Sequence, residues 1–170
     1  MTEESSRTRR RFLKLASASL GGVVGAVLAI PLLESVVTPA LRGRKSHFSR
    51  LARLGDLPTG SPVDRTFADR VSDAFIQETV LRDVWVVKHG PSNVDVFSPI
   101  CPHLGCRFDW HSGRNQFLCP CHGSVFSMVG EVVGGPAPRP LDTLSTRIEG
   151  DEIFVEWERF KVGISEKVAV

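Results

Sequence analysis

The chain begins with a long apolar run that predicts a helix. Residues 15–33 carry no charged side chain, and Lys14 and Glu34 bound the run. At 1.5 Å per residue, this run reaches roughly 28 Å as a helix, close to the thickness of the hydrocarbon core of a bilayer. Cleavable signal sequences have shorter apolar cores, and glycine is common in membrane spans. The pattern therefore predicts one N-terminal transmembrane helix.

Further along the chain, the period of the apolar positions changes to that of β-strands. Apolar and polar residues alternate in short segments, and glycine, proline and asparagine separate these segments. Many short strands with such turns predict a mostly β, antiparallel domain. The expected strands are 83–88 paired with 94–98, the two arms of 145–160 around Gly150-Asp151, and shorter strands at 117–119 and 130–135.

These patterns divide the chain into four parts. Residues 1–14 form a basic leader, 15–33 the span, 34–54 a polar linker and 55–170 the folded domain. Pro39 and Gly43 interrupt the linker, and turn residues mark the entry into the domain. The tail 161–170 carries no clear pattern.

The charged residues bear on the location of the domain. The net charge is only +2, which argues against nucleic-acid binding. Five basic residues precede the span and five follow it soon afterwards, so their count does not orient it. The stretch TRRRFLK at 8–14 resembles a twin-arginine export signal, with Arg9-Arg10 as the pair. This route carries folded proteins, and it places the domain on the outer side of the cytoplasmic membrane, held by a single span.

All four cysteines lie in two half-matching boxes, CPHLGC at 101–106 and CPCHGS at 119–124. Cys-x-His in one box and Cys-x2-His in the other offer two thiols and two imidazoles. Zinc is disfavoured, because its ligand pairs are usually farther apart and two thiols would remain free in an oxidising compartment. Disulfides alone leave the histidines unexplained, and a Cys–His nucleophile needs no second box. An iron–sulfur cluster is the fourth explanation for the two boxes.

The two boxes and the stretch GGPAPRPL at 134–141 resemble the cluster-binding region of the Rieske iron–sulfur protein of cytochrome bc-type quinol–cytochrome c reductases. The third stretch resembles the proline loop that covers the cluster in this family. The span, linker and export signal match the family as well. The resemblance implies an antiparallel Rieske-type β domain with an inserted cluster-binding subdomain at about 99–141. It also implies one Rieske [2Fe–2S] cluster per chain.

The resemblance also implies roles for individual residues. Cys106 and Cys121 would form a disulfide between the two boxes. Ser124 matches the family serine whose hydroxyl bonds a cluster sulfur, and His122 is expected to contact the quinol and accept its proton. The implied metal ligands are Cys101 and Cys119 on one iron and His103 and His122 on the other.

Position 126 departs from the family pattern. High-potential family members carry a tyrosine there, which donates a hydrogen bond to a ligand sulfur. This chain has Phe126, with ten phenylalanines and no tyrosine in all. Because hydrogen bonds to sulfur tune the cluster potential, we expect a lower potential, which suits a quinol such as menaquinol.

The resemblance implies an oxidoreductase subunit that oxidises quinol and passes one electron to a c-type cytochrome. The linker would let the head move between a site on the cytochrome b subunit and this acceptor. The expected assembly is a dimeric, multi-subunit respiratory or photosynthetic complex. One alternative is the Rieske subunit of an exported molybdenum oxidase such as arsenite oxidase. A soluble Rieske ferredoxin is disfavoured by the span and the Cys106–Cys121 pair, and a zinc-stabilised tethered domain is the last alternative.

Overall fold

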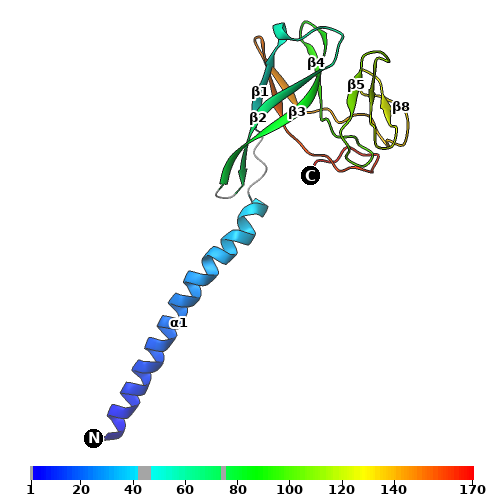
Figure 1. Ribbon diagram of the computed structural model, residues 1–170. Helices are drawn as coiled ribbons and strands as arrows, with labels where there is room; N and C mark the ends of the chain where they lie inside the picture. Colours follow the sequence, from blue (N-terminus) through cyan, green and yellow to red (C-terminus); the bar gives the residue numbers. More distant parts are fainter. Residues whose placement is uncertain (1, 42–46, 74–75) are drawn as a thin grey trace. The chain divides into compact units, whose positions relative to one another are not determined.

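The computed structural model describes residues 2–41, 47–73 and 76–170, and the chain separates into two units, Met1–Lys45 and Ser46–Val170. The first unit is the helix α1, Thr2–Leu41 (Figure 1). The predicted apolar helix is therefore present, but it is longer than 15–33 at both ends. It continues past Pro39, where the sequence predicts an interruption. A proline removes only one helical N–H, so a helix can continue through it at a cost in stability.

Among the described residues, α1 contains the one segment that is long and apolar enough to span a membrane, Arg7–Val37. No part of this segment is buried in the protein, and leucines and valines along it are largely exposed. An apolar surface of this extent requires a lipid or protein environment.

The second unit, which we call the head, is built from strands in three antiparallel sheets (Figure 1). One sheet has the order β1-β10-β9, the second β2-β3-β4 and the third β5-β6-β7-β8. A 3-10 turn, Leu54–Asp56, follows β1. The strands are β1 Phe48–Arg53, β2 Val63–Asp73, β3 Ile76–Gly90, β4 Asn93–Phe97, β5 Asp109–His111, β6 Gln116–Leu118, β7 Val125–Phe126, β8 Val132–Gly134, β9 Thr146–Glu149 and β10 Glu152–Glu156.

Strand β3 connects the two hydrophobic cores of the head. Successive side chains of a strand point to opposite faces of the sheet. Val84 and Val86 pack into the core shared with β1 and β10, whereas Trp85 and Val87 pack into the core beneath the sheet β5–β8. This explains the continuous apolar run VWVV at 84–87 of β3, the part of the strand that is buried on both faces. The sheet β5–β8, which we call the small sheet, therefore packs against β3.

The hairpin β3–β4 and the hairpin β9–β10 confirm the two hairpins predicted from the sequence, although β10 ends at Glu156, before the predicted limit of 160. The predicted linker 34–54 overlaps elements of both units. Its first residues belong to α1, and 48–53 forms β1, which pairs with β10. Residues 42–46 of this linker lie outside the described residues. The second unit includes β1, which precedes the predicted domain start at 55.

Candidate metal centre

The two cysteine boxes form matching loops that extend from the small sheet. The first lies between β4 and β5, and the second between β6 and β7. In each loop the amide of a glycine donates to the carbonyl of the first cysteine, from Gly105 to Cys101 at 3.0 Å and from Gly123 to Cys119 at 3.1 Å. Both glycines have a positive φ, 83° and 73°, which other residues rarely adopt. The half-matching sequences therefore fold into equivalent turns.

The structure brings the four predicted ligands together as two like pairs. Cys101 and Cys119 are free thiols, both buried. The imidazole rings of His103 and His122 face each other with centroids 4.8 Å apart and planes at 90°. His103 is half-buried, whereas His122 is exposed.

Two buried polar atoms at this site have no hydrogen-bond partner in the described protein, Nδ1 of His103 and Oγ of Ser124. A buried polar atom without a partner is costly, so an orphan of this kind indicates that another group completes the site. An imidazole nitrogen is a common ligand of iron, and a hydroxyl can donate to a cluster sulfur. The residues present therefore fit an iron–sulfur cluster.

The electrostatics of the thiol pair point the same way. Burial raises the pKa of the Cys101 thiol, and the neighbouring Cys119 thiol raises this pKa further. The backbone N–H of His103 and the Ser124 hydroxyl, which both lie near the Cys101 sulfur, lower this pKa in part. Without a bound metal, the thiols of Cys101 and Cys119 are therefore difficult to deprotonate together. A bound cation removes this difficulty, since metal coordination deprotonates thiols.

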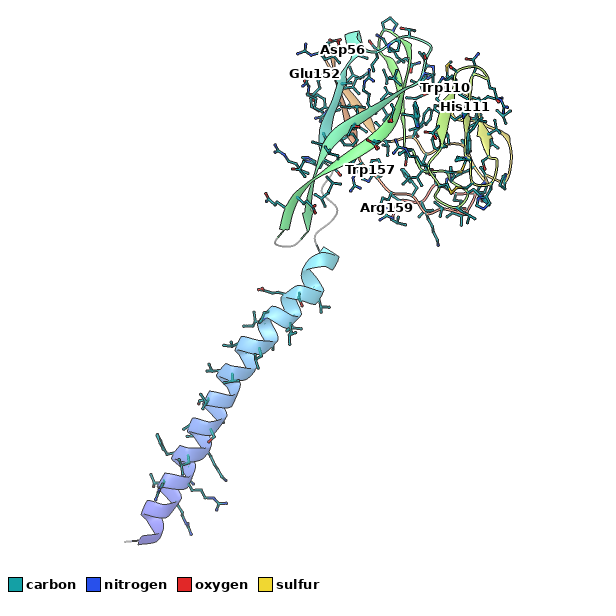
Figure 2. The ribbon with its side chains drawn as sticks, in the orientation of Figure 1. Asp56, Trp110, His111, Glu152, Trp157 and Arg159 are labelled. Atoms are coloured by element: carbon teal, nitrogen blue, oxygen red, sulfur yellow. A yellow bond between two sulfur atoms is a disulfide. The ribbon has the colours of Figure 1, made fainter. Side chains whose placement is uncertain are left out.

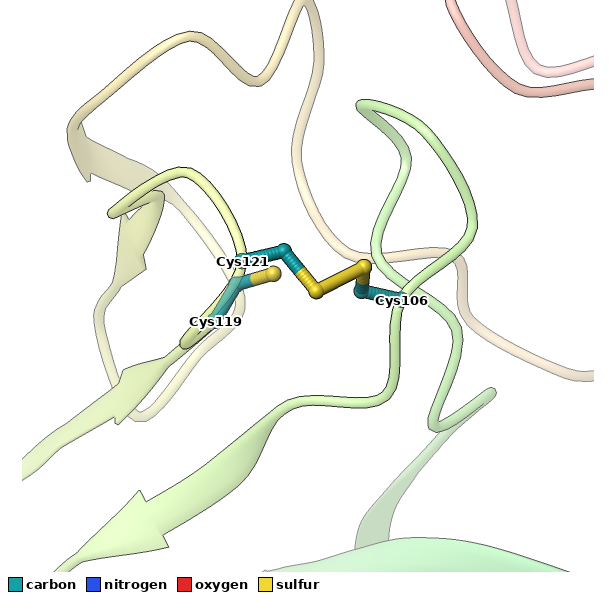
Figure 3. Close-up of side chains that lie close together, drawn as sticks. All are labelled: Cys106, Cys119 and Cys121. Atoms are coloured by element: carbon teal, nitrogen blue, oxygen red, sulfur yellow. A yellow bond between two sulfur atoms is a disulfide. The ribbon is translucent and has the colours of Figure 1, made fainter.

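The predicted disulfide between Cys106 and Cys121 is present in the structure, and it joins the two loops directly. The sulfur of Cys119 lies next to this bond, and the three sulfur atoms are within 4.8 Å of one another (Figure 3). Two of these three sulfurs are tied up in the disulfide, so Cys119 alone of this group is available as a ligand.

The proline loop, residues 134–141, packs closely on the second box. Gly135 has φ +85°, and a Cβ at this position would lie 2.5 Å from Ser124 Cα and closer still to the Gly123 carbonyl oxygen. Only glycine allows this approach. At the other end of the loop, Arg139 forms a buried ion pair with Asp142, with Nη2 2.8 Å from Oδ2. The sequence predicted this loop but no role for Arg139. A single charged residue in an apolar, proline-rich stretch is a signal that could have indicated one.

An aromatic layer supports the loops. Phe126, Phe108 and Phe117 are fully buried and lie in the same core as Cys101 and Cys119. Trp85 donates from Nε1 to the Phe108 carbonyl, at 3.2 Å. Phe126 therefore fills its position without a hydroxyl group.

Two other histidines lie apart from the paired rings. In the β3–β4 hairpin, Nε2 of His89 lies 2.8 Å from Oδ2 of Asp95. His111 is exposed on β5, where Figure 2 labels it beside Trp110.

The fold and the donor set together define a [2Fe–2S] iron–sulfur protein. Residues 48–145 match the family model of the Rieske [2Fe-2S] domain, and residues 1–36 match that of the Ubiquitinol-cytochrome C reductase Fe-S subunit TAT signal. The chain belongs to the Rieske family, as the iron–sulfur subunit of a bc-type quinol–cytochrome c reductase. The twin-arginine signal and anchor helix make the head an exported, membrane-associated domain.

Curated relatives span almost the whole chain. The menaquinol:cytochrome c reductase iron–sulfur subunit of Geobacillus thermodenitrificans is 30% identical over 87% of this chain and 90% of its own length. The cytochrome b6-f complex iron–sulfur subunit of Chlorobaculum thiosulfatiphilum is 31% identical over 86% of this chain and 74% of its own. Among solved structures, the plasma membrane Rieske protein of Synechocystis PCC 6803 is 33% identical, with a TM-score of 0.40, and covers 53% of this chain and 84% of its own.

Proposed function

We propose that this subunit oxidises menaquinol at the outer face of the cytoplasmic membrane and passes the electron to a c-type cytochrome. The observation that carries the proposal is the contrast between the two ligand pairs. The thiols of Cys101 and Cys119 are buried, whereas the imidazole of His122 is exposed beside that of His103. A substrate that approaches the head therefore meets an imidazole first.

In this proposal Cys101 and Cys119 hold one iron, and His103 and His122 hold the other. When bound, the [2Fe–2S] cluster supplies a one-electron acceptor, and imidazole ligands are known to raise the potential of this class of cluster. The orphan Nδ1 of His103 and the buried Oγ of Ser124 support this assignment, because both need a partner at this position. Ser124 would donate to a cluster sulfur.

The exposed ring of His122 would receive the quinol. A neutral imidazole nitrogen that faces outwards can accept a hydrogen bond from a quinol hydroxyl and then its proton. The other ring nitrogen would bind the metal and thereby fix the direction of the ring. The proline loop packs on the second box beside His122, where Gly135 lies against Gly123 and Ser124. His122 would thus be the catalytic residue, and Ser124 and Gly135 position it.

Phe126 supports menaquinol as the quinol. It is fully buried in the core that contains both free thiols, and it has no hydroxyl to donate to either sulfur. Fewer hydrogen bonds to sulfur mean a lower cluster potential, which matches a quinol of low potential. The similar chain of Geobacillus thermodenitrificans is a menaquinol:cytochrome c reductase subunit.

The proposed partners follow from the chain's anchorage. In this proposal the export signal lies at 1–14 and the single span at 15–33, and the C-terminal head lies outside the cytoplasm. The Arg7–Val37 segment supports one span, because its apolar side chains are exposed. The head would meet a cytochrome b subunit and a c-type cytochrome within a dimeric complex.

Co-purification from membranes tests this proposal. We expect the tagged full chain to bring down a b-type haem protein, and these membranes to reduce cytochrome c with a menaquinol analogue. A Cys101→Ser chain should bring down the same partner but restore no activity, because only the cluster is lost. Recovery of a molybdenum protein without b-type haem would contradict the proposal.

A further inference from the structure

The last residues of the chain form a hairpin that lies outside the sheets. After β10 the chain turns back on itself, with Lys161 N donating to Val168 O and Val170 N donating to Arg159 O, both at 2.9 Å. We call residues 159–170 the C-terminal hairpin. Figure 1 shows it in red beneath the loops of the small sheet, and Figure 2 labels Arg159 at its start. Its tip, residues 162–164, touches two parts of the metal centre.

The tip first contacts the loop of the first box. Gly163 N donates to the carbonyl of Pro102 at 2.9 Å. Pro102 is fully buried and lies between Cys101 and His103. Gly163 has φ +76°, and a Cβ there would lie 3.5 Å from the His103 carbonyl oxygen. The tip therefore fixes the peptide that connects two proposed ligands.

The tip also contacts the proline loop through Arg139. Nη1 of Arg139 donates to the carbonyl of Ile164 at 2.6 Å, while Nε and Nη2 donate to the two oxygens of Asp142 at 3.0 and 2.8 Å. Asp142 already balances the charge of the Arg139 guanidinium. The bond from Arg139 to the Ile164 carbonyl therefore connects the proline loop to the tip of the C-terminal hairpin. Nearby, Lys167 Nζ donates to the Thr143 carbonyl at 2.6 Å. Such bonds from a charged donor are stronger than neutral ones.

A continuous series of contacts therefore links the two boxes. It runs from Pro102 through Gly163 and Arg139 into the proline loop, whose Gly135 lies against Ser124 of the second box. The disulfide between Cys106 and Cys121 is the other link between these loops. In the sequence of the first box, one link starts at Pro102, before His103, and the other starts at Cys106, after it.

We propose that the C-terminal hairpin and Arg139 form a non-covalent clasp that positions the His103 loop and retains the cluster when the disulfide is reduced. The inference rests on the proposed ligand assignment. In this view Arg139 and Gly163 are positioning residues, because they act through Pro102 and the proline loop and touch no ligand side chain.

The test measures cluster release from the loaded full chain into an iron chelator, followed by visible absorbance, with and without a dithiol reductant. The variant is a chain that ends at Lys161. After reduction of the disulfide, we expect this chain to lose its cluster about tenfold faster than the full chain, the factor that one charge-assisted hydrogen bond supplies. With the disulfide intact, the difference should be smaller.

Two point variants address the same link if the truncated chain does not fold. Arg139→Lys keeps the charge beside Asp142 but cannot make the fork of bonds that includes Ile164. Gly163→Ala strains the tip, and Gly60→Ala is its matched control, because Gly60 has φ +75° and nothing within 4 Å of an added Cβ. We expect Arg139→Lys and Gly163→Ala to speed release and to change the nitrogen couplings in the electron paramagnetic resonance (EPR) spectrum. Gly60→Ala should do neither.

The outcomes separate this inference from the proposed function. If His103→Ala removes the cluster while the truncated chain and both point variants release it at the rate of the full chain, the clasp is wrong and the ligand assignment stands. If His103→Ala retains a complete cluster, the ligand assignment fails and the clasp fails with it.

Discussion

His103 and His122 lie in different loops, yet their rings meet edge to face with centroids 4.8 Å apart. The two loops carry equivalent turns, each closed by a glycine amide that donates to the first cysteine. In the second box the histidine comes one position later than in the first. The two rings are therefore brought together although the boxes match only in part, and one of the rings is left exposed.

Phe126→Tyr is expected to raise the midpoint potential of the cluster. The added hydroxyl would lie in the core that holds Cys101 and Cys119, where it can donate to a sulfur. A net hydrogen bond of about 1 kcal/mol corresponds to about 40 mV for one electron. Redox titration checks this, with Phe67→Tyr in the other core as the control. An unchanged or lower potential would contradict the role assigned to Phe126.

Gly135→Ala is expected to destabilise the head and weaken cluster retention. Its Cβ would meet the backbone of Gly123 and Ser124, which cannot move aside as a flexible side chain could. We expect a loss of about 2–4 kcal/mol, from overpacking and from a left-handed backbone. Gly134→Ala is the neighbouring control, because nothing lies within 4 Å of its Cβ. Denaturant unfolding of the two variants should differ clearly, and equal stabilities would refute the close approach.

The disulfide variants should behave differently from each other. Replacing both Cys106 and Cys121 by serine removes a link that closes a loop of 15 residues, at a cost of about 3 kcal/mol. Replacing Cys121 alone leaves the Cys106 thiol near Cys119, since these sulfurs lie within 4.8 Å. On cluster loss in air, we expect a Cys106–Cys119 disulfide in the single variant only. Peptide mapping without reductant would detect it, and its absence would contradict the observed proximity.

Asp83 should contribute a small, pH-dependent stabilisation. The Thr66 hydroxyl lowers the pKa of this carboxyl, and Arg107 lowers it further despite partial burial. A lowered pKa in the folded state stabilises the protein above the unfolded pKa of about 3.9, and this contribution is lost as the pH falls through the folded pKa. Because 40% of the Asp83 side chain is exposed, solvent screens its contacts, and Thr66→Val should cost less than about 1 kcal/mol at neutral pH. In urea unfolding, the difference between the two chains should shrink as the pH falls through the folded pKa, and a difference that does not change with pH would contradict this.

The sequence predicted the elements whose residues carry a local pattern. The hairpins β3–β4 and β9–β10 alternate clearly and have turn residues between their arms, and the apolar run of α1 is unmistakable. Strands β1 and β2 were not predicted, because neither has a strong apolar pattern, although β2 pairs with the next strand in the chain, β3. In β1, FSRLAR has only two large apolar residues and pairs with β10, and β2 contributes Phe67 as its one large, fully packed side chain.

The site was predictable to the extent that its donors lie in short motifs. The resemblance named both free thiols, both facing imidazoles and the disulfide pair from the boxes alone. The contacts of Arg139 and Gly163 could not be predicted, because they join segments that are far apart in the chain through backbone carbonyls. Every residue has a backbone carbonyl, so the sequence does not show which carbonyl accepts a hydrogen bond. The role of the C-terminal hairpin can therefore be inferred only from the structure.

The central claim is that two thiolates and two imidazoles of this chain hold one [2Fe–2S] cluster. Pulsed EPR of the dithionite-reduced full chain tests it most directly. We predict couplings to two coordinated nitrogens, with one lost or replaced in His122→Cys and His103→Cys chains that still bind iron. A reduced wild-type cluster without nitrogen couplings, or a purified chain that contains zinc and no iron, would contradict it.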